Sequence, residues 1–190
     1  MQAEESGWAT DRMILVQDRG MLALLLFWWR LKQANGGTVL PTRRQMDPCA
    51  FPRSILPNMF IYERDGDRRL RCRLSGTRMR ELFGVDGTGL YLDQMMVPAS
   101  VPGRNALFHD SLDNRMPMFY RGYLVPAGRG WRGFNRLLLP VSVEPGAPPA
   151  QVMGMVRVFD PPPGNRDAAD ADGLVSARLL GDGECGELAE

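Results

Sequence analysis

The sequence has 190 residues, of which 44% are hydrophobic and 24% charged, as expected for one globular domain with extensions. Its net charge of +1 indicates neither nucleic acid nor a membrane surface as a partner, although the acidic residues from Asp160 onward leave the preceding part of the chain basic. Three separated cysteines and a single histidine argue against a disulfide framework and a zinc site, and they favour a reducing cytoplasm.

The first predicted element lies within residues 1–36 and is a helix from about Asp11 to Ala34. Its apolar run, MLALLLFWW, is much shorter than the ~20 residues that a membrane span needs. Apolar side chains lie on two sides of the helix, so two apolar surfaces must cover it. Both sides can pack in the same domain, one can contact a second subunit, or the helix can lie on a membrane surface. We expect the second arrangement, a dimerisation element with four candidate interface residues: Leu22, Leu25, Trp28 and Trp29.

A β-hairpin is predicted near the start of the main domain, which we place at residues 37–160. It pairs MFIYE (59–63) with LRCRLS (70–75). Alternation along the second strand puts its leucines and cysteine on one face and its arginines on the other. This basic face is either solvated or a binding surface for an anionic nucleotide or nucleic acid, and its arginines are Arg64, Arg68, Arg69, Arg71 and Arg73.

The rest of the main domain reads as short helices followed by three long strands. Helices are predicted at 77–84 and 103–114, and strands at 117–126, 133–143 and 151–159. Together with the hairpin, these elements predict an α+β fold with a five-stranded antiparallel sheet and helices on one face. Residues 161–190 form an acidic tail that contains Pro and Gly, and we expect it to be disordered apart from a short helix at LVSARLL.

The glycine-rich stretch GVDGTG at 84–89 is not predicted to bind phosphate. A phosphate loop of the Walker type needs a lysine directly after its last glycine, and the only lysine of the chain is Lys32. These glycines are better explained as backbone turns between short helices. No G-x-S-x-G nucleophile motif is present either, so the sequence predicts no catalytic residues and no enzyme activity.

Several stretches together resemble a PAS domain, and specifically a bacterial family of small, largely single-domain PAS proteins. They cover about residues 22–160 and read LLFWWRLKQANGGTVLPTRRQMDP, ILPNMFIYE, LRCRLSGTRMRELFGVDGTGLYLDQM and NRLLLPVS. The resemblance implies the PAS fold and a sensory or regulatory role in signal transduction through a protein partner. It names no ligand, because this fold hosts many functions.

Two kinds of ligand site follow from the resemblance. Haem-binding PAS sensors take an axial imidazole from the helix before the last three strands, where this chain has His109. His109 could therefore bind haem or another cofactor, or it could simply be exposed on the helix surface. The second kind of site is a mostly apolar pocket between the sheet and the helices that holds a small-molecule ligand; alternatively, the same side chains only pack the core. The candidate pocket residues are Met79, Phe83, Leu107, Phe119, Tyr123, Asn135, Leu138 and Met155, with Arg78 as a further polar anchor.

Overall fold

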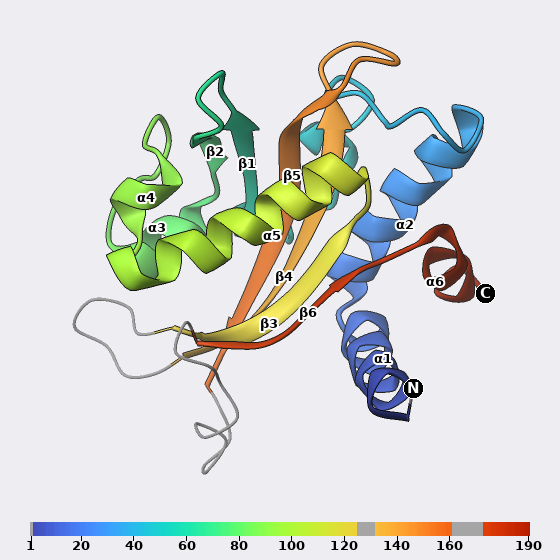
Figure 1. The fold of residues 1–190 in the computed structure, drawn as a ribbon, viewed down its shortest axis with the longest axis horizontal. Coiled ribbons are helices and arrows are strands. Elements are labelled where there is room, and N and C mark those ends of the chain that lie inside the picture. The colour runs from blue at the N-terminus through green and yellow to red at the C-terminus, as the bar shows by residue number, and fades with distance from the viewer. Residues whose placement is uncertain (1, 125–131, 161–172) are drawn as a thin grey trace.

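The computed structural model describes residues 2–124, 132–160 and 173–190. Its centre is one antiparallel sheet with strand order β2-β1-β5-β4-β3-β6 (Figure 1). The strands are β1 (Met59–Arg64), β2 (Leu70–Ser75), β3 (Met118–Leu124), β4 (Arg132–Ser142), β5 (Pro149–Phe159) and β6 (Leu174–Leu179). The predicted α+β fold with an antiparallel sheet is confirmed, and the first five strands lie within two residues of their predicted bounds. The predicted number of five strands is wrong, because the C-terminal part of the chain adds a sixth.

One face of the sheet, called the inner face here, is covered by short helices and by one longer helix (Figure 1). The short helices are α3 (Thr77–Phe83), α4 (Leu92–Met95) and a 3-10 turn, η3 (Pro98–Ser100); the longer one is α5 (Val101–Asn114). The core beneath them is rich in aromatic rings, and the Phe60 ring packs directly over Gly154 of the neighbouring strand. A Cβ atom at Gly154 would overlap with this ring and with the carbonyl oxygen of Leu137, so only glycine fits there.

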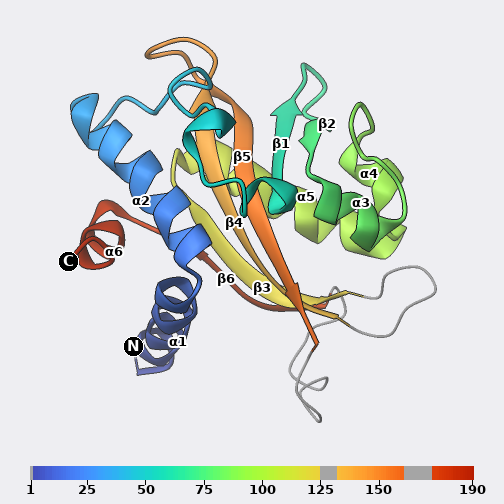
Figure 2. The same ribbon diagram turned by 180° about the vertical axis from the view of Figure 1, so that it is seen from behind.

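The opposite or outer face is covered by two N-terminal helices, α1 (Gln2–Gln17) and α2 (Arg19–Ala34), as Figure 2 shows from behind. The predicted single helix is therefore divided in two. The division is at Asp18, whose side chain accepts hydrogen bonds from the backbone N–H groups of Gly20 and Met21, both at 3.0 Å, and so caps α2. The helices predicted within the main domain lie on one face of the sheet, and the N-terminal helices cover the other face, where the apolar side chains of α2 pack.

Helix α2 begins very close to the sheet. A Cβ atom at Gly20 would lie 2.8 Å from Ile55 Cγ2 and 2.9 Å from Arg157 Nη2. Any larger residue at this position would therefore have to displace one of these two side chains. Further along, Trp28 is fully buried and its indole Nε1 donates to the carbonyl oxygen of Pro140 at 2.8 Å. A 3-10 turn (η1, Pro48–Ala50) and another before β1 (η2, Leu56–Asn58) complete this side.

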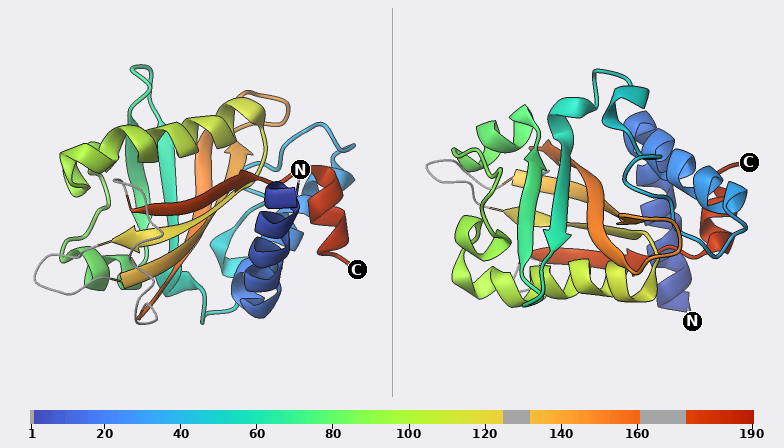
Figure 3. Two further views of the ribbon diagram at one scale, coloured as in Figure 1. Left: turned by 60° about the horizontal axis from the view of Figure 1, so that its bottom comes forward. Right: turned by 90° about the horizontal axis from the view of Figure 1, so that it is seen from above.

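The C-terminal segment is ordered where the structure describes it. Instead of the predicted short helix, residues 174–179 form strand β6 beside β3, and Asp182–Glu187 form helix α6. Lys32 Nζ of α2 binds the carboxylate of Asp182 at 2.8 Å, and Cys185 is buried among the outer-face apolar residues. Helix α6 thus supplies the second apolar surface that α2 requires. Figure 3 shows both termini on this side of the molecule.

Within the described ranges, no helix combines the length and apolar character that a membrane span requires.

Candidate functional site

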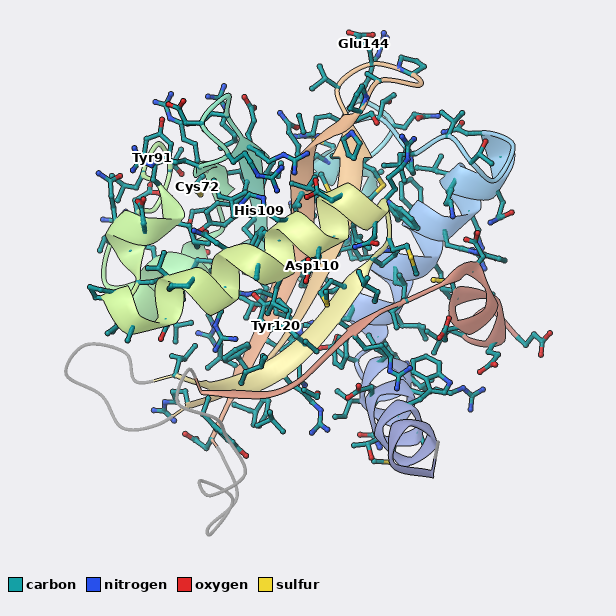
Figure 4. The ribbon with its side chains drawn as sticks, in the orientation of Figure 1. Cys72, Tyr91, His109, Asp110, Tyr120 and Glu144 are labelled. Atoms are coloured by element: carbon teal, nitrogen blue, oxygen red, sulfur yellow. The ribbon has the colours of Figure 1, made fainter. Side chains whose placement is uncertain are left out.

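A buried arginine occupies the middle of the inner face. Arg136 on β4 is 6% exposed, and its Nη1 donates to the hydroxyl oxygen of Tyr120 on β3 at 2.9 Å. Its guanidinium lies over the rings of Phe60, Tyr120 and Phe134, at 5.3, 5.7 and 5.6 Å from their centroids. Its Nε is buried and has no hydrogen-bond partner, and in the described part of the chain no carboxylate forms an ion pair with it. Figure 4 places Tyr120 beside α5.

A second arginine approaches the same rings from the helix above. Arg104 on α5 is 4% exposed, and its guanidinium lies 5.2 Å from the centroid of Phe134 and 5.6 Å from that of Tyr120. The inner face therefore buries two guanidinium groups against shared aromatic rings. Arginine seldom occurs fully buried unless an anion or a good set of acceptors pairs with it.

The inner arginine belongs to a row of residues that lie side by side across three strands. Register places Tyr120 of β3 opposite Arg136 of β4, and Arg136 opposite Val156 of β5. The adjacent row, one residue along each strand, consists of Arg121, Asn135 and Arg157. Because side chains alternate along a strand, this second row points to the outer face. We call these two sets the inner row and the outer row.

The outer row holds the N-terminal helices through two ion pairs. Arg121 Nε donates to Asp11 Oδ1 of α1 at 2.8 Å, and Arg157 Nε donates to Asp18 Oδ2 at 2.9 Å, at the junction of α1 and α2. Asp11 is itself buried, so the ion pair with Arg121 compensates for the loss of water around its carboxylate. The two rows thus connect the centre of the inner face with the junction of the two outer helices.

A cleft of about 1100 Å³ opens at this junction, between α1, α2 and the outer row. Its walls include Asp18, Gly20 and Ile14 from the helical side, and Arg121 and Arg157 from the sheet. The cleft leaves one side of the junction open, although Gly20 itself lies close to Ile55 and Arg157. The two ion pairs join the junction to the sheet beside this opening.

The candidate pocket residues do not come together in one place. Met79, Leu107 and Leu138 pack in the inner core, whereas Phe119 and Met155 pack in the outer core. Tyr123 and Asn135 line the cleft beside the N-terminal helices. Arg78 is at the surface in an ion pair with Glu81, and the side chain of Phe83 lies outside the described part of the structure. The period of a strand explains the split, because neighbouring positions of β3 to β5 face opposite sides.

His109 lies on the side of α5 that faces the β1–β2 hairpin (Figure 4). Its neighbour Phe108, not His109 itself, reaches the inner core. The pKa of His109 is lowered, mainly by partial burial and then by the charges of Arg68 and Arg64. A haem would need apolar space in front of the imidazole, whereas these arginines, which bind Asp113, occupy its surroundings. The residues around His109 therefore do not fit a haem.

Two of the four candidate dimer residues are buried within the chain. Leu25 and Trp28 have no exposed surface, because they pack on the sheet, whereas Leu22 and Trp29 are half-buried. Both apolar sides of α2 are thus covered by the same chain, by the sheet and by α6. A second subunit cannot contact Leu25 or Trp28 in this arrangement.

The basic strand face is largely neutralised by neighbouring groups. Arg64 and Arg68 both bind Asp113, which holds the pKa of that carboxyl at about 2. Arg69 binds Asp93 at 3.1 Å and stacks on the ring of Tyr91 at 3.7 Å from its centroid. The two remaining arginines also have partners: Arg73 binds Glu63, and Arg71 donates to the carbonyl oxygen of Gly89. This pairing does not favour a binding surface for polyanions.

Neither the inner row nor the outer row was predicted from the sequence. A signal was available, because Phe134, Arg136 and Leu138 alternate along a predicted strand and put an arginine on an otherwise apolar face. The partners Asp11 and Asp18 had no such signal. Their pairing depends on how α1 and α2 dock on the sheet. Among the described residues, no group of three or more His, Cys, Asp or Glu side chains is arranged to hold a metal ion.

Comparison with known proteins agrees with the fold described above. A model of the PAS domain family matches residues 16–156, and the chain belongs to this family. PAS domains are in general sensory and regulatory modules and are typically non-catalytic. The PAS domain of a protein from Colwellia psychrerythraea is a similar solved structure, with 11% identity and a TM-score of 0.41 over 53% of this chain and 86% of that chain. A search among curated proteins gave no match.

Proposed function

We propose that this chain is a cytoplasmic, non-catalytic PAS module that senses a change at its inner face and passes it to a protein partner through α1 and α2. The observation that carries the proposal is the adjacency of the two rows. The inner row contains the buried arginine, and the outer row holds both ion pairs of the N-terminal helices.

The physical link is the backbone of three neighbouring strands. Tyr120 binds the inner guanidinium while the next residue, Arg121, binds Asp11 on the other face. In the same way Val156 lies beside Arg136, and the next residue, Arg157, binds Asp18. A shift of β3 or β5 that repacks the inner row therefore moves the arginines that hold the helices.

A ligand acts on such a system by preferring one packing over another. It shifts the population of the two arrangements by the ratio of its affinities for them. The junction of α1 and α2 borders an open cleft on the side of Arg157, so a shift of the outer row can be taken up there, whereas the neighbouring Leu15 and Met21 are fully buried in the outer core. This makes the cleft side of the junction the part of the outer face most able to respond.

A homodimer is part of the proposal, with a contact different from the one first expected. Helix α1 exposes two apolar side chains one turn apart, Met13 at 54% and Val16 at 47%. Sedimentation velocity of the full chain is expected to give a dimer, and the Met13→Ser/Val16→Ser variant a monomer. Val143→Ser, which removes an equally exposed valine elsewhere, is the matched control. A wild-type chain that sediments as a monomer at every concentration rejects the homodimer.

Coupling between the rows is tested with a double-mutant cycle. Tyr120→Phe removes the hydroxyl group that holds the inner arginine, and Arg157→Met removes one outer ion pair; the two side chains lie on different strands and opposite faces. Urea denaturation is expected to show a coupling free energy of about 0.5 kcal/mol or more, since additivity fails for connected sites. Tyr120→Phe with Arg71→Met, an exposed arginine at the sheet edge, should be additive. Additive effects in both pairs would remove the basis of the proposed coupling.

A further inference from the structure

We propose that the inner face binds a small apolar carboxylate through the guanidinium of Arg136. This inference rests on the proposed sensory function and names the chemical class of what is sensed.

The buried guanidinium of Arg136 has no anionic partner in the described chain. A buried cation without an anion is unfavourable compared with one in water. The described chain gives this guanidinium one neutral hydroxyl, that of Tyr120, and the faces of three rings. Cation–π contacts offset part of the cost but supply no negative charge. The site is therefore complementary to an anion.

The free donors of Arg136 have a shape that suits a carboxylate. The buried Nε–H of Arg136 has no acceptor, and together with a neighbouring Nη–H it forms one edge of the planar guanidinium. Such an edge matches the two oxygens of a carboxylate, which it binds with two parallel hydrogen bonds.

The nearest opening limits the size of a ligand. A cleft of about 260 Å³ opens between α3 and the ends of β4 and β5; its lining includes Val156, the register partner of Arg136, but not Arg136 itself. At ~30 Å³ for each water-sized volume, it holds a molecule of about nine non-hydrogen atoms. Beyond Val156 the surroundings of the guanidinium are aromatic, which favours an apolar body over a hydrated one such as phosphate.

Two arginines and two carboxylates stand at the mouth of this cleft. Arg78 and Arg132 line it together with Leu82 and Val158. Both arginines form ion pairs, with Glu81 and Asp160, at the surface. The charges at the rim therefore balance, and the inner guanidinium is the group that the anion would bind.

Calorimetric titration and thermal unfolding of the full chain test the inference, with benzoate, butyrate and acetate as probes and benzamide as the neutral isostere of benzoate. We expect benzoate to bind, and at about ten times its Kd to raise the Tm by about 3 °C. Benzamide should not bind detectably. Arg136→Met should weaken benzoate binding by about 10- to 100-fold, because it removes charge-assisted hydrogen bonds. Arg71→Met, at the exposed sheet edge, is the matched control and should bind as the wild type does.

The result that overturns the inference is the absence of binding for all three carboxylates. Equal affinity for benzamide, or unchanged affinity in Arg136→Met, overturns it as well. If Arg136→Met does not fold, Tyr120→Phe takes its place, because this variant keeps the charge of Arg136. Tyr120→Phe should weaken benzoate binding several-fold, and wild-type affinity in this variant would count against the site. If no carboxylate binds but the double-mutant cycle shows coupling between the two rows, the ligand class is wrong. If benzoate binds but the cycle shows no coupling, the proposed path from the inner row to the helices is wrong.

Discussion

Replacement of Asp18 separates the two tasks that this side chain performs at the junction of α1 and α2. One carboxylate oxygen accepts from the backbone N–H groups of Gly20 and Met21, and the other accepts from Arg157 at 2.9 Å. Loss of a helix N-cap costs about 1 kcal/mol. The ion pair is partly exposed, at 16% for the Asp18 side chain and 35% for the Arg157 side chain, so its contribution is about 0.5–1 kcal/mol.

The expected values follow from these two contributions. Asp18→Ala should lower the free energy of unfolding by about 1.5–2 kcal/mol, because both are lost. Asp18→Asn keeps an amide oxygen for the cap and loses the charge, so it should lower the free energy by only about 0.5–1 kcal/mol. For a chain of this length, the Tm is expected to fall by about 2–4 °C for each kcal/mol.

Urea denaturation followed by tryptophan fluorescence measures both variants. A matching slope of the unfolding free energy against urea concentration shows that the same surface is exposed in each case. A free energy of unfolding for Asp18→Ala within about 0.3 kcal/mol of the wild type would show that neither the cap nor the ion pair stabilises the fold. Equal instability of the Asn and Ala variants would show that the cap contributes nothing.

Three further predictions test separate parts of the fold. Gly154→Ala should lower stability by about 2 kcal/mol through overpacking, while Gly66→Ala, in open space, should change it by less than about 0.5 kcal/mol; equal effects would contradict the packing described. At pH 8 an aromatic disulfide reagent should modify exposed Cys49 at least ~100-fold faster than Cys185, whose pKa is raised to about 12 mainly by burial; fast reaction at both would mean that α6 is not docked. Asp113→Asn should lower the free energy of unfolding by less than about 1 kcal/mol, because the carboxylate is 46% exposed. The pKa of Asp113 in the folded state, about 2, lies below its unfolded value, so this loss should be seen above about pH 4 and should disappear as the pH falls through 2. A loss of stability that persists at pH 1.5 would contradict the ion pairs.

Local patterns were sufficient to predict most of the central domain. The β1–β2 hairpin follows from alternation in LRCRLS and from Asp65, whose side chain accepts from the backbone N–H groups of Asp67 and Arg69 in the turn. The three long strands have β-branched and aromatic residues between clear turn signals, so their bounds needed no tertiary information. The helix ending at Asn114 likewise has its own periodicity.

The remaining errors concern contacts between distant segments. Strand β6 was missed because LVSARLL has no strong period of its own and becomes a strand through pairing with β3. One of the two apolar sides of α2 was expected to contact a second subunit, whereas the sheet and α6 cover both sides. The same holds for the site. The sequence places Arg136 on one face of its strand, but its pairing with Tyr120 depends on the strand register, and the outer ion pairs depend on how α1 and α2 pack on the sheet.

Hydrogen–deuterium exchange of the full chain, resolved by peptide, tests most directly whether the inner row controls the outer helices. The comparison is between the wild type, Arg136→Met and the surface control Arg71→Met. We predict that Arg136→Met changes the exchange rates of amides at residues 18–21 by about fivefold or more, while the control leaves them unchanged. Altered exchange in α5 and β4 together with wild-type exchange at 18–21 would contradict the account.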